Sequence, residues 1–383
     1  YRFKNHLLSP GLVNTHTHVP MSLFRGLADN LPLKEWLENY IFPLEGQFVK
    51  EDFISAGTRL SALEFIRTGV TTFCDMYFYN QVLAEAVDQS GLRGIIGVGV
   101  PSVEKDWKEW KRKARDLKDS YKNNPKIHAA IAPHAPYTVD SEVLAQTGEF
   151  AKSENFLLTI HVSESAWEQQ EIQKRHNATP VQYLHRLGVT GPNSLFVHCV
   201  HVNGEDLQIM KETGTSFSYN PESNMKLSSG IAPVNKALKS GVTVGLGTDG
   251  AASNNNLNFF GEMDTGIKLQ SLKGSESLTA EDMFQMATIE GARALNLEKE
   301  IGSIEVGKWA DIIAINLDQP QFHPPYNLIS HLVYSAQGSE VDFVMCGGQV
   351  LMENRQVKTL NEQDIYRESR DFGNRIQRFL NSS

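Results

Sequence analysis

The chain has 383 residues, of which 40% are hydrophobic and 21% charged, and its formal net charge is −9 at pH 7. This acidic balance argues against a nucleic-acid partner bound through phosphate neutralisation and provides no basic patch for an anionic membrane. The three cysteines form no close pair, which indicates a reducing compartment. No apolar segment approaches the about 18 residues of a membrane span, and the start does not resemble a signal peptide. We therefore expect a cytoplasmic protein.

Eight short apolar runs follow one another along the chain, separated by longer amphipathic segments that commonly end in Gly or Asn. They are residues 7–15, 70–76, 92–100, 127–133, 155–162, 194–200, 215–221 and 242–249. Buried parallel strands are typically apolar throughout, and strands that alternate with helices form βαβ units. Eight such units predict an α/β fold, a (β/α)₈ TIM-like barrel over residues 1–300.

The pattern changes after the barrel. The sequence pattern of residues 278–295 predicts a helix with Thr279 as its N-cap. Residues 301–317 alternate like strands, and residues 341–357 predict a hairpin that turns at Gly347 and Gly348. We expect a small, incomplete β-sandwich domain over residues 301–360 and a charged amphipathic helix over residues 361–383.

Polar side chains gather at the ends of the predicted strands. They are His16 and His18 at the first, His134 at the fourth, His161 and then Glu164 at the fifth, His198 at the sixth, and Asp249 at the eighth. The carboxyl ends of barrel strands form the active-site face. A buried polar group without a partner costs about 1–3 kcal/mol, so this accumulation indicates a shared ligand.

Metal binding is the first hypothesis for these residues. His16 and His18 are two residues apart, so a strand directs both imidazoles to the same face. With His161 and Asp249 they provide three nitrogens and one carboxylate, a set that suits Zn²⁺ and would also accept Fe²⁺ or Ni²⁺. The segment Gly245–Gly250 matches G-x-G-x-x-G, but a polar stretch follows it in place of a helix. We interpret it as a strand exit that presents Asp249; a nicotinamide titration would test the alternative of a dinucleotide site.

The combination of these motifs resembles the amidohydrolase superfamily. It consists of HTH at the first strand, HxxE at the fifth, His at the sixth and GTDGAASNN at the eighth. The fourth strand lacks the lysine that bridges two metals, as in the mononuclear branch that contains deaminases and triazine hydrolases. Residues 21–45, 219–234 and 246–263 resemble the family of 5′-methylthioadenosine/S-adenosylhomocysteine deaminases.

That resemblance implies substrate contacts. Glu45 would bind the ribose hydroxyls, with a solvated helix-end carboxylate as the alternative, and His134 would also contact the substrate. Trp36 is a candidate for the same pocket, with a place in the core as its alternative. Family members often place arginines after the third strand; here only Arg112 and Lys113 lie downstream, so the group that binds the 5′-substituent stays open. The family's N-terminal strands are expected to lie outside this sequence, and a homo-oligomer is expected.

The implied activity is hydrolytic deamination of an adenine nucleoside, namely S-adenosylhomocysteine, 5′-methylthioadenosine or adenosine, by a metal-bound hydroxide. His198 and Asp249 would orient the nucleophile, and Glu164 would act as the general acid and base. Two alternatives remain. One is a deaminase or chlorohydrolase of another heterocycle, of guanine or s-triazine type, on the same site. The other is a non-catalytic metal-binding scaffold.

Overall fold

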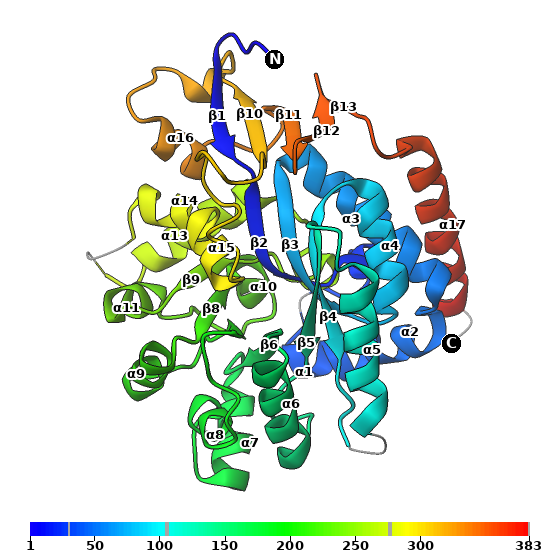
Figure 1. The fold of residues 1–383 in the computed structure, drawn as a ribbon, viewed down its shortest axis with the longest axis vertical. Coiled ribbons are helices and arrows are strands. Elements are labelled where there is room, and N and C mark those ends of the chain that lie inside the picture. The colour runs from blue at the N-terminus through cyan, green and yellow to red at the C-terminus, as the bar shows by residue number, and fades with distance from the viewer. Residues whose placement is uncertain (30, 104–106, 275–277, 382–383) are drawn as a thin grey trace.

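The computed structural model describes residues 1–29, 31–103, 107–274 and 278–381. Its central sheet has eight parallel strands in sequence order, which confirms the predicted barrel (Figure 1). The strands are β2 (Leu12–Thr17), β3 (Val70–Tyr77), β4 (Arg93–Gly99), β5 (Ile127–Ala132), β6 (Leu157–Val162), β7 (Ser194–His198), β8 (Ser216–Tyr219) and β9 (Val244–Leu246).

The sheet closes where its first and last strands meet. The Thr15 hydroxyl on β2 donates to the Leu246 carbonyl of β9 at 2.9 Å, and the Asp249 amide donates to the His16 carbonyl at 3.0 Å. Every residue of β2 and β3 is buried, as expected for strands covered on both faces. Closure therefore brings the ends of β2 and β9 together, although more than 200 residues separate them.

Helices surround the barrel and alternate with its strands. They are α3 (Glu51–Thr68), α4 (Asn80–Ser90), α5 (Trp107–Ser120), α6 (Ser141–Ser153), α7 (Ala166–His176), α8 (Pro180–Arg186), α9 (Gly204–Thr213), α11 (Val234–Ser240) and α13 (Phe259–Ser271). Shorter elements lie near the barrel mouth: η1 (Val19–Phe24), α1 (Leu33–Trp36), η2 (Leu37–Ile41), α2 (Phe42–Phe48), α10 (Pro221–Lys226) and α12 (Ala251–Asn254).

A second, antiparallel sheet has the order β1-β10-β11-β12-β13. Its strands are β1 (His6–Pro10), β10 (Ile312–Asn316), β11 (Val341–Cys346), β12 (Gln349–Glu353) and β13 (Gln356–Val357). The β11–β12 hairpin turns at Gly347 and Gly348, as predicted. Of residues 301–317 only β10 is a strand, because the preceding residues form turns and loops.

The predicted first strand is in fact two strands in different sheets. β1 pairs with β10, and β2 enters the barrel. Gly11 joins them where a Cβ atom would lie 2.1 Å from the Thr71 hydroxyl, so only glycine fits this close approach. The sequence pattern did not predict that β1 pairs with β10 of the C-terminal sheet, side by side with it in Figure 1; that further N-terminal strands of the family lie outside this sequence stays a prediction. The domain boundaries at residues 300 and 360 stay predictions.

The C-terminal part also differs from the sequence pattern in one helix. Residues 278–295 form α14 (Ala280–Met286) and α15 (Ile289–Ala294), because Thr288 leaves the helical region at φ −134°, ψ −98°. Thr279 caps α14 as predicted. Helix α17 (Glu362–Leu380) packs along α3, with the rings of Phe53 and Phe372 5.6 Å apart. Within the described residues, no helix combines the length and the apolar character needed to cross a bilayer.

Candidate active site

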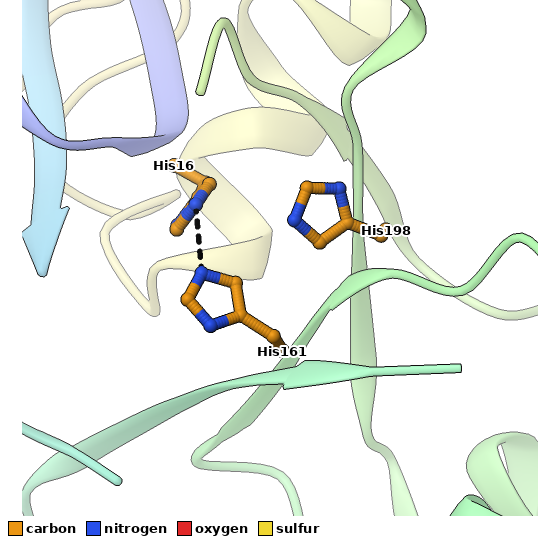
Figure 2. A group of neighbouring side chains, drawn as sticks. All are labelled: His16, His161 and His198. Carbon is orange, nitrogen blue, oxygen red and sulfur yellow. Dashed lines mark hydrogen bonds between the residues drawn. The ribbon is translucent and has the colours of Figure 1, made fainter. Parts of the chain in front are cut away.

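The predicted polar residues converge at the carboxyl end of the barrel. His16 lies in β2, His161 in β6 and His198 at the end of β7; Figure 2 shows their three rings facing one common space. Two groups of side chains have ligand atoms close enough to bind one metal ion, His16 with His161 and His198, and His16 with His18 and Asp249. Four of these side chains are buried, and His18 is partly buried.

Short distances join these side chains. The Asp249 Oδ1 atom lies 3.3 Å from His18 Nε2 and 3.4 Å from His16 Nε2. The Nε2 atoms of His16 and His161 are 3.3 Å apart (Figure 2). The four residues predicted to bind the metal are therefore joined through His16, whose Nε2 atom lies within 3.4 Å of both His161 and Asp249, while Asp249 also lies beside His18.

The hydrogen bonds behind the rings show that this group of side chains suits a cation. His18 Nδ1 donates to the Met76 carbonyl at 2.5 Å, and His161 Nδ1 donates to the His134 carbonyl at 2.8 Å. A carbonyl can only accept, so both neutral rings carry their proton on Nδ1 and present an Nε2 lone pair. These lone pairs face a carboxylate oxygen and another imidazole nitrogen. Acceptors that face acceptors repel one another unless a proton or a metal ion lies between them, and backbone partners of this kind orient metal ligands.

His198 carries its proton on the other ring nitrogen. Its Nδ1 accepts a hydrogen bond from Asn224 Nδ2 at 2.9 Å. The proton of the neutral ring is then on Nε2, which lies 3.6 Å from Glu164 Oε2. Burial lowers the pKa of His198 to about 3, so the ring is neutral at physiological pH. His198 therefore offers a hydrogen-bond donor where His18 and His161 offer lone pairs.

Helix α10 supports this region, and sequence reasoning did not identify its two contributing residues. Ser223 donates to Asp249 Oδ2 at 2.6 Å, and Asn224 contacts His198 as described. Both lie in the segment YNPESNMKL, whose family resemblance was the available signal. Glu168, also not predicted, accepts from the backbone amides of Ser163 and Glu164 at 2.8 Å each and thereby holds the exit of β6.

Strained backbone marks the same strand exits. Ser163, His198 and Asp249 have φ values of 55°, 72° and 60°, in the left-handed region that non-glycine residues seldom adopt. Such strain concentrates at functional sites, where surrounding contacts maintain it. Gly247 allows the chain that leaves β9 to pass close to β2, since a Cβ atom at this position would lie 3.0 Å from the His16 amide nitrogen. The segment after Asp249 is the four-residue helix α12 in place of the expected polar loop.

Glu164 lies beside the proposed metal ligands, and one of its carboxylate oxygens has no hydrogen-bond partner among the described residues. The residue is 6% exposed, and its Oε1 atom is buried without a hydrogen-bond partner among the described residues. Burial raises the pKa of Glu164 well above its usual range, and the nearby charge of Asp249 adds to this effect. This shift favours the protonated form of the carboxyl group, which can donate a proton into the cavity.

A cavity extends from these residues to the barrel mouth. Its empty volume, including the part open to solvent, is about 910 Å³, and its lining includes Trp36, Glu45, Tyr77, His134 and Glu164. Glu45 Oε1 accepts a hydrogen bond from the Tyr77 hydroxyl at 2.7 Å. The Trp36 residue is 4% exposed, and its indole Nε1 has no partner among the described residues. Thus all four predicted substrate contacts, Trp36, Glu45, His134 and Glu164, line one cavity, and the proposed metal ligands His18, His161 and Asp249 line it as well.

Comparison with known proteins agrees with this geometry. The profile of the amidohydrolase family matches residues 7–351. The chain belongs to the amidohydrolase family. This amidohydrolase is 45% identical over 380 residues to a 5-methylthioadenosine/S-adenosylhomocysteine deaminase of Thermoanaerobacter pseudethanolicus, covering 97% of this chain and 88% of the relative. It is 43% identical over 367 residues to a 5′-deoxyadenosine deaminase of Methanosphaera stadtmanae, covering 94% of this chain and 85% of that relative.

A solved structure is similar over nearly the whole chain. It is an adenosine deaminase of Xanthomonas campestris with bound zinc, with a TM-score of 0.94 and 33% identity. The match covers 97% of this chain and 86% of that chain. The fold and the family resemblance predicted from the sequence are thereby confirmed.

Proposed function

We propose that this amidohydrolase deaminates adenine nucleosides, replacing the 6-amino group of the purine with oxygen and releasing ammonia. The observation that carries the proposal is the buried Glu164 beside the four proposed metal-ligand side chains, with one oxygen 3.6 Å from His198 Nε2 and the other without a partner among the described residues. Two relatives and one structural neighbour named as deaminases of adenine nucleosides support it.

His16, His18, His161 and Asp249 would hold one divalent cation, and we propose Zn²⁺, supported by the zinc of the similar adenosine deaminase. The same ligands would also accept Fe²⁺ or Ni²⁺. When bound, such a cation lowers the pKa of a coordinated water toward about 7 and so supplies a nucleophile at neutral pH.

The protein's own groups direct the proton transfers. His198 would present its Nε2–H to the attacking water and orient it together with Asp249, whose Oδ2 atom accepts from Ser223. Glu164 delivers its proton to the ring nitrogen next to C6 as water adds to that carbon. It then takes one proton from the added oxygen and passes it to the amino group, which leaves as ammonia, and the second proton of the added oxygen returns to Glu164 and regenerates its acid form. A raised pKa suits a group that must act first as acid and then as base.

The other end of the cavity would bind the sugar. Glu45 is a carboxyl group on α2 whose second oxygen has no hydrogen bond from the described residues, so it can accept from both ribose hydroxyls. Burial lowers the pKa of His134 to about 4, which leaves a neutral ring for the substrate. The unpartnered indole N–H of Trp36 is a donor for a polar atom of the nucleoside, which favours a substrate contact over a purely core role.

The test is Glu164→Gln, with Glu149→Gln on the exposed side of α6 as a matched control. We expect Glu164→Gln to retain its metal content and to lose about 10²- to 10⁴-fold in kcat for ammonia release from adenosine, methylthioadenosine and S-adenosylhomocysteine. The control should match the wild type. Full turnover by Glu164→Gln would contradict the mechanism. Turnover of guanine or an s-triazine but of no adenine nucleoside would contradict the proposed substrate class.

A further inference from the structure

The end of β3 connects the two ends of the cavity. Two consecutive residues of this strand each hold a different functional group: the Met76 carbonyl accepts from His18 Nδ1 at 2.5 Å, and the Tyr77 hydroxyl donates to Glu45 Oε1 at 2.7 Å. One strand therefore positions both a proposed metal ligand and the proposed ribose-binding carboxylate. The spacing between the reacting carbon and the sugar of a bound nucleoside has to match the spacing that this strand sets.

The strand and the carboxylate differ in how firmly they are held. All eight residues of β3 are buried, and the strand pairs with β2 on one side and β4 on the other. Glu45, by contrast, lies on the seven-residue helix α2, which follows the π-helical turn η2. Among the described residues, only Tyr77 forms a hydrogen bond with the Glu45 carboxylate. The position of the Glu45 carboxylate therefore depends on one phenol.

The charge of Glu45 depends on the same contact. Burial raises the pKa of Glu45 to about 7, and the hydrogen bond from Tyr77 opposes this shift. Burial and the neighbouring Glu45 raise the pKa of Tyr77 well above 10, so the phenol remains a donor at all physiological pH values. A carboxylate can accept from two hydroxyls, whereas a protonated carboxyl group loses part of that capacity.

We infer that Tyr77 is a positioning residue that determines selectivity for nucleosides with a free 2′,3′-diol, acting through Glu45. This inference rests on the proposed function, because it concerns how that site recognises the sugar. Tyr77 does not touch the reacting atoms; it orients the carboxylate that binds the diol. Its loss should weaken binding of ribosyl substrates and leave the chemical step unchanged.

The experiment compares adenosine with 2′,3′-dideoxyadenosine in Tyr77→Phe, which removes only the hydroxyl. We expect about a tenfold lower kcat/KM for adenosine, carried by KM, because a hydrogen bond to a charged group is lost. With the dideoxy substrate the change should stay within about twofold. Tyr79→Phe is the matched control: this residue is 45% exposed and two positions further along. It should behave as the wild type with both substrates.

A double-mutant cycle identifies the route of the effect. Glu45→Gln alone should show the same selective loss for adenosine, and Tyr77→Phe should add nothing in that background. Equal losses for both substrates, a loss in kcat with KM unchanged, or an additive loss in the Glu45→Gln background would each overturn the inference. If the wild-type enzyme releases ammonia from neither nucleoside, the proposed function itself is wrong.

Discussion

Asp311→Asn tests the contact that connects the barrel to the antiparallel sheet. Arg93 on β4 is 0% exposed and Asp311, just before β10, is 4% exposed. Arg93 Nη2 lies 3.3 Å and 3.2 Å from the two oxygens of Asp311, and Nε donates to Oδ2 at 3.2 Å. The Gly347 amide also donates to Asp311 Oδ1 at 2.6 Å. The substitution keeps the size of the side chain and removes its charge.

The expected magnitude follows from this burial. Removing one partner leaves the other charge uncompensated in the interior, which costs about 3–5 kcal/mol. The exposed pair Arg112–Asp116, one turn apart on α5, provides the control. Asp116→Asn should cost less than about 0.5 kcal/mol, because solvent screens an exposed pair.

Urea denaturation followed by circular dichroism measures both variants. Metal content must be equal in all samples, because metal bound to the native state adds stability of its own. The midpoint for Asp311→Asn should fall at an unchanged slope, so that the difference reports stability. A loss below about 1 kcal/mol, or one equal to the control, would refute the reasoning that charge compensation is what this buried pair provides.

Two further predictions concern pH and metal. Since the pKa of Glu45 is raised to about 7, its carboxylate is lost as the pH falls through that value; KM for adenosine should therefore rise below pH 7, while KM for 2′,3′-dideoxyadenosine should not. A pH-independent ratio of the two KM values would contradict this expectation. Chelation of the metal should abolish ammonia release and lower the melting temperature. Adding Zn²⁺ at about 100 times its Kd should then raise the free energy of unfolding by about 2.7 kcal/mol. Calorimetry and metal analysis check this, and a chelated enzyme with full activity would refute the cation site.

The fold and the set of converging residues were predictable because their signals are local. Each strand of the barrel is a short apolar run, and His16 and His18 share a face through the two-residue period of a strand. The remaining candidate ligands stand at strand ends, which parallel βαβ topology brings to one face without any knowledge of the side-chain packing. The structure places them there, and their catalytic roles rest on the experiments above.

Other features depend on contacts between distant segments. Nothing in the run 7–15 distinguishes its first half, which pairs with β10, from its second half, which enters the barrel. Asn224 reaches His198 across 26 residues, Tyr77 reaches Glu45 across 32, and Arg93 reaches Asp311 across 218.

Periodicity describes which face of an element is buried, and it contains no information about which polar atom that face will meet. Local pattern therefore determines where the strands, and with them the candidate ligands, are found. Tertiary packing decides the tautomer of each histidine, the partner of each buried carboxylate and the sheet to which β1 belongs, because each depends on which distant segments the fold brings within hydrogen-bond distance.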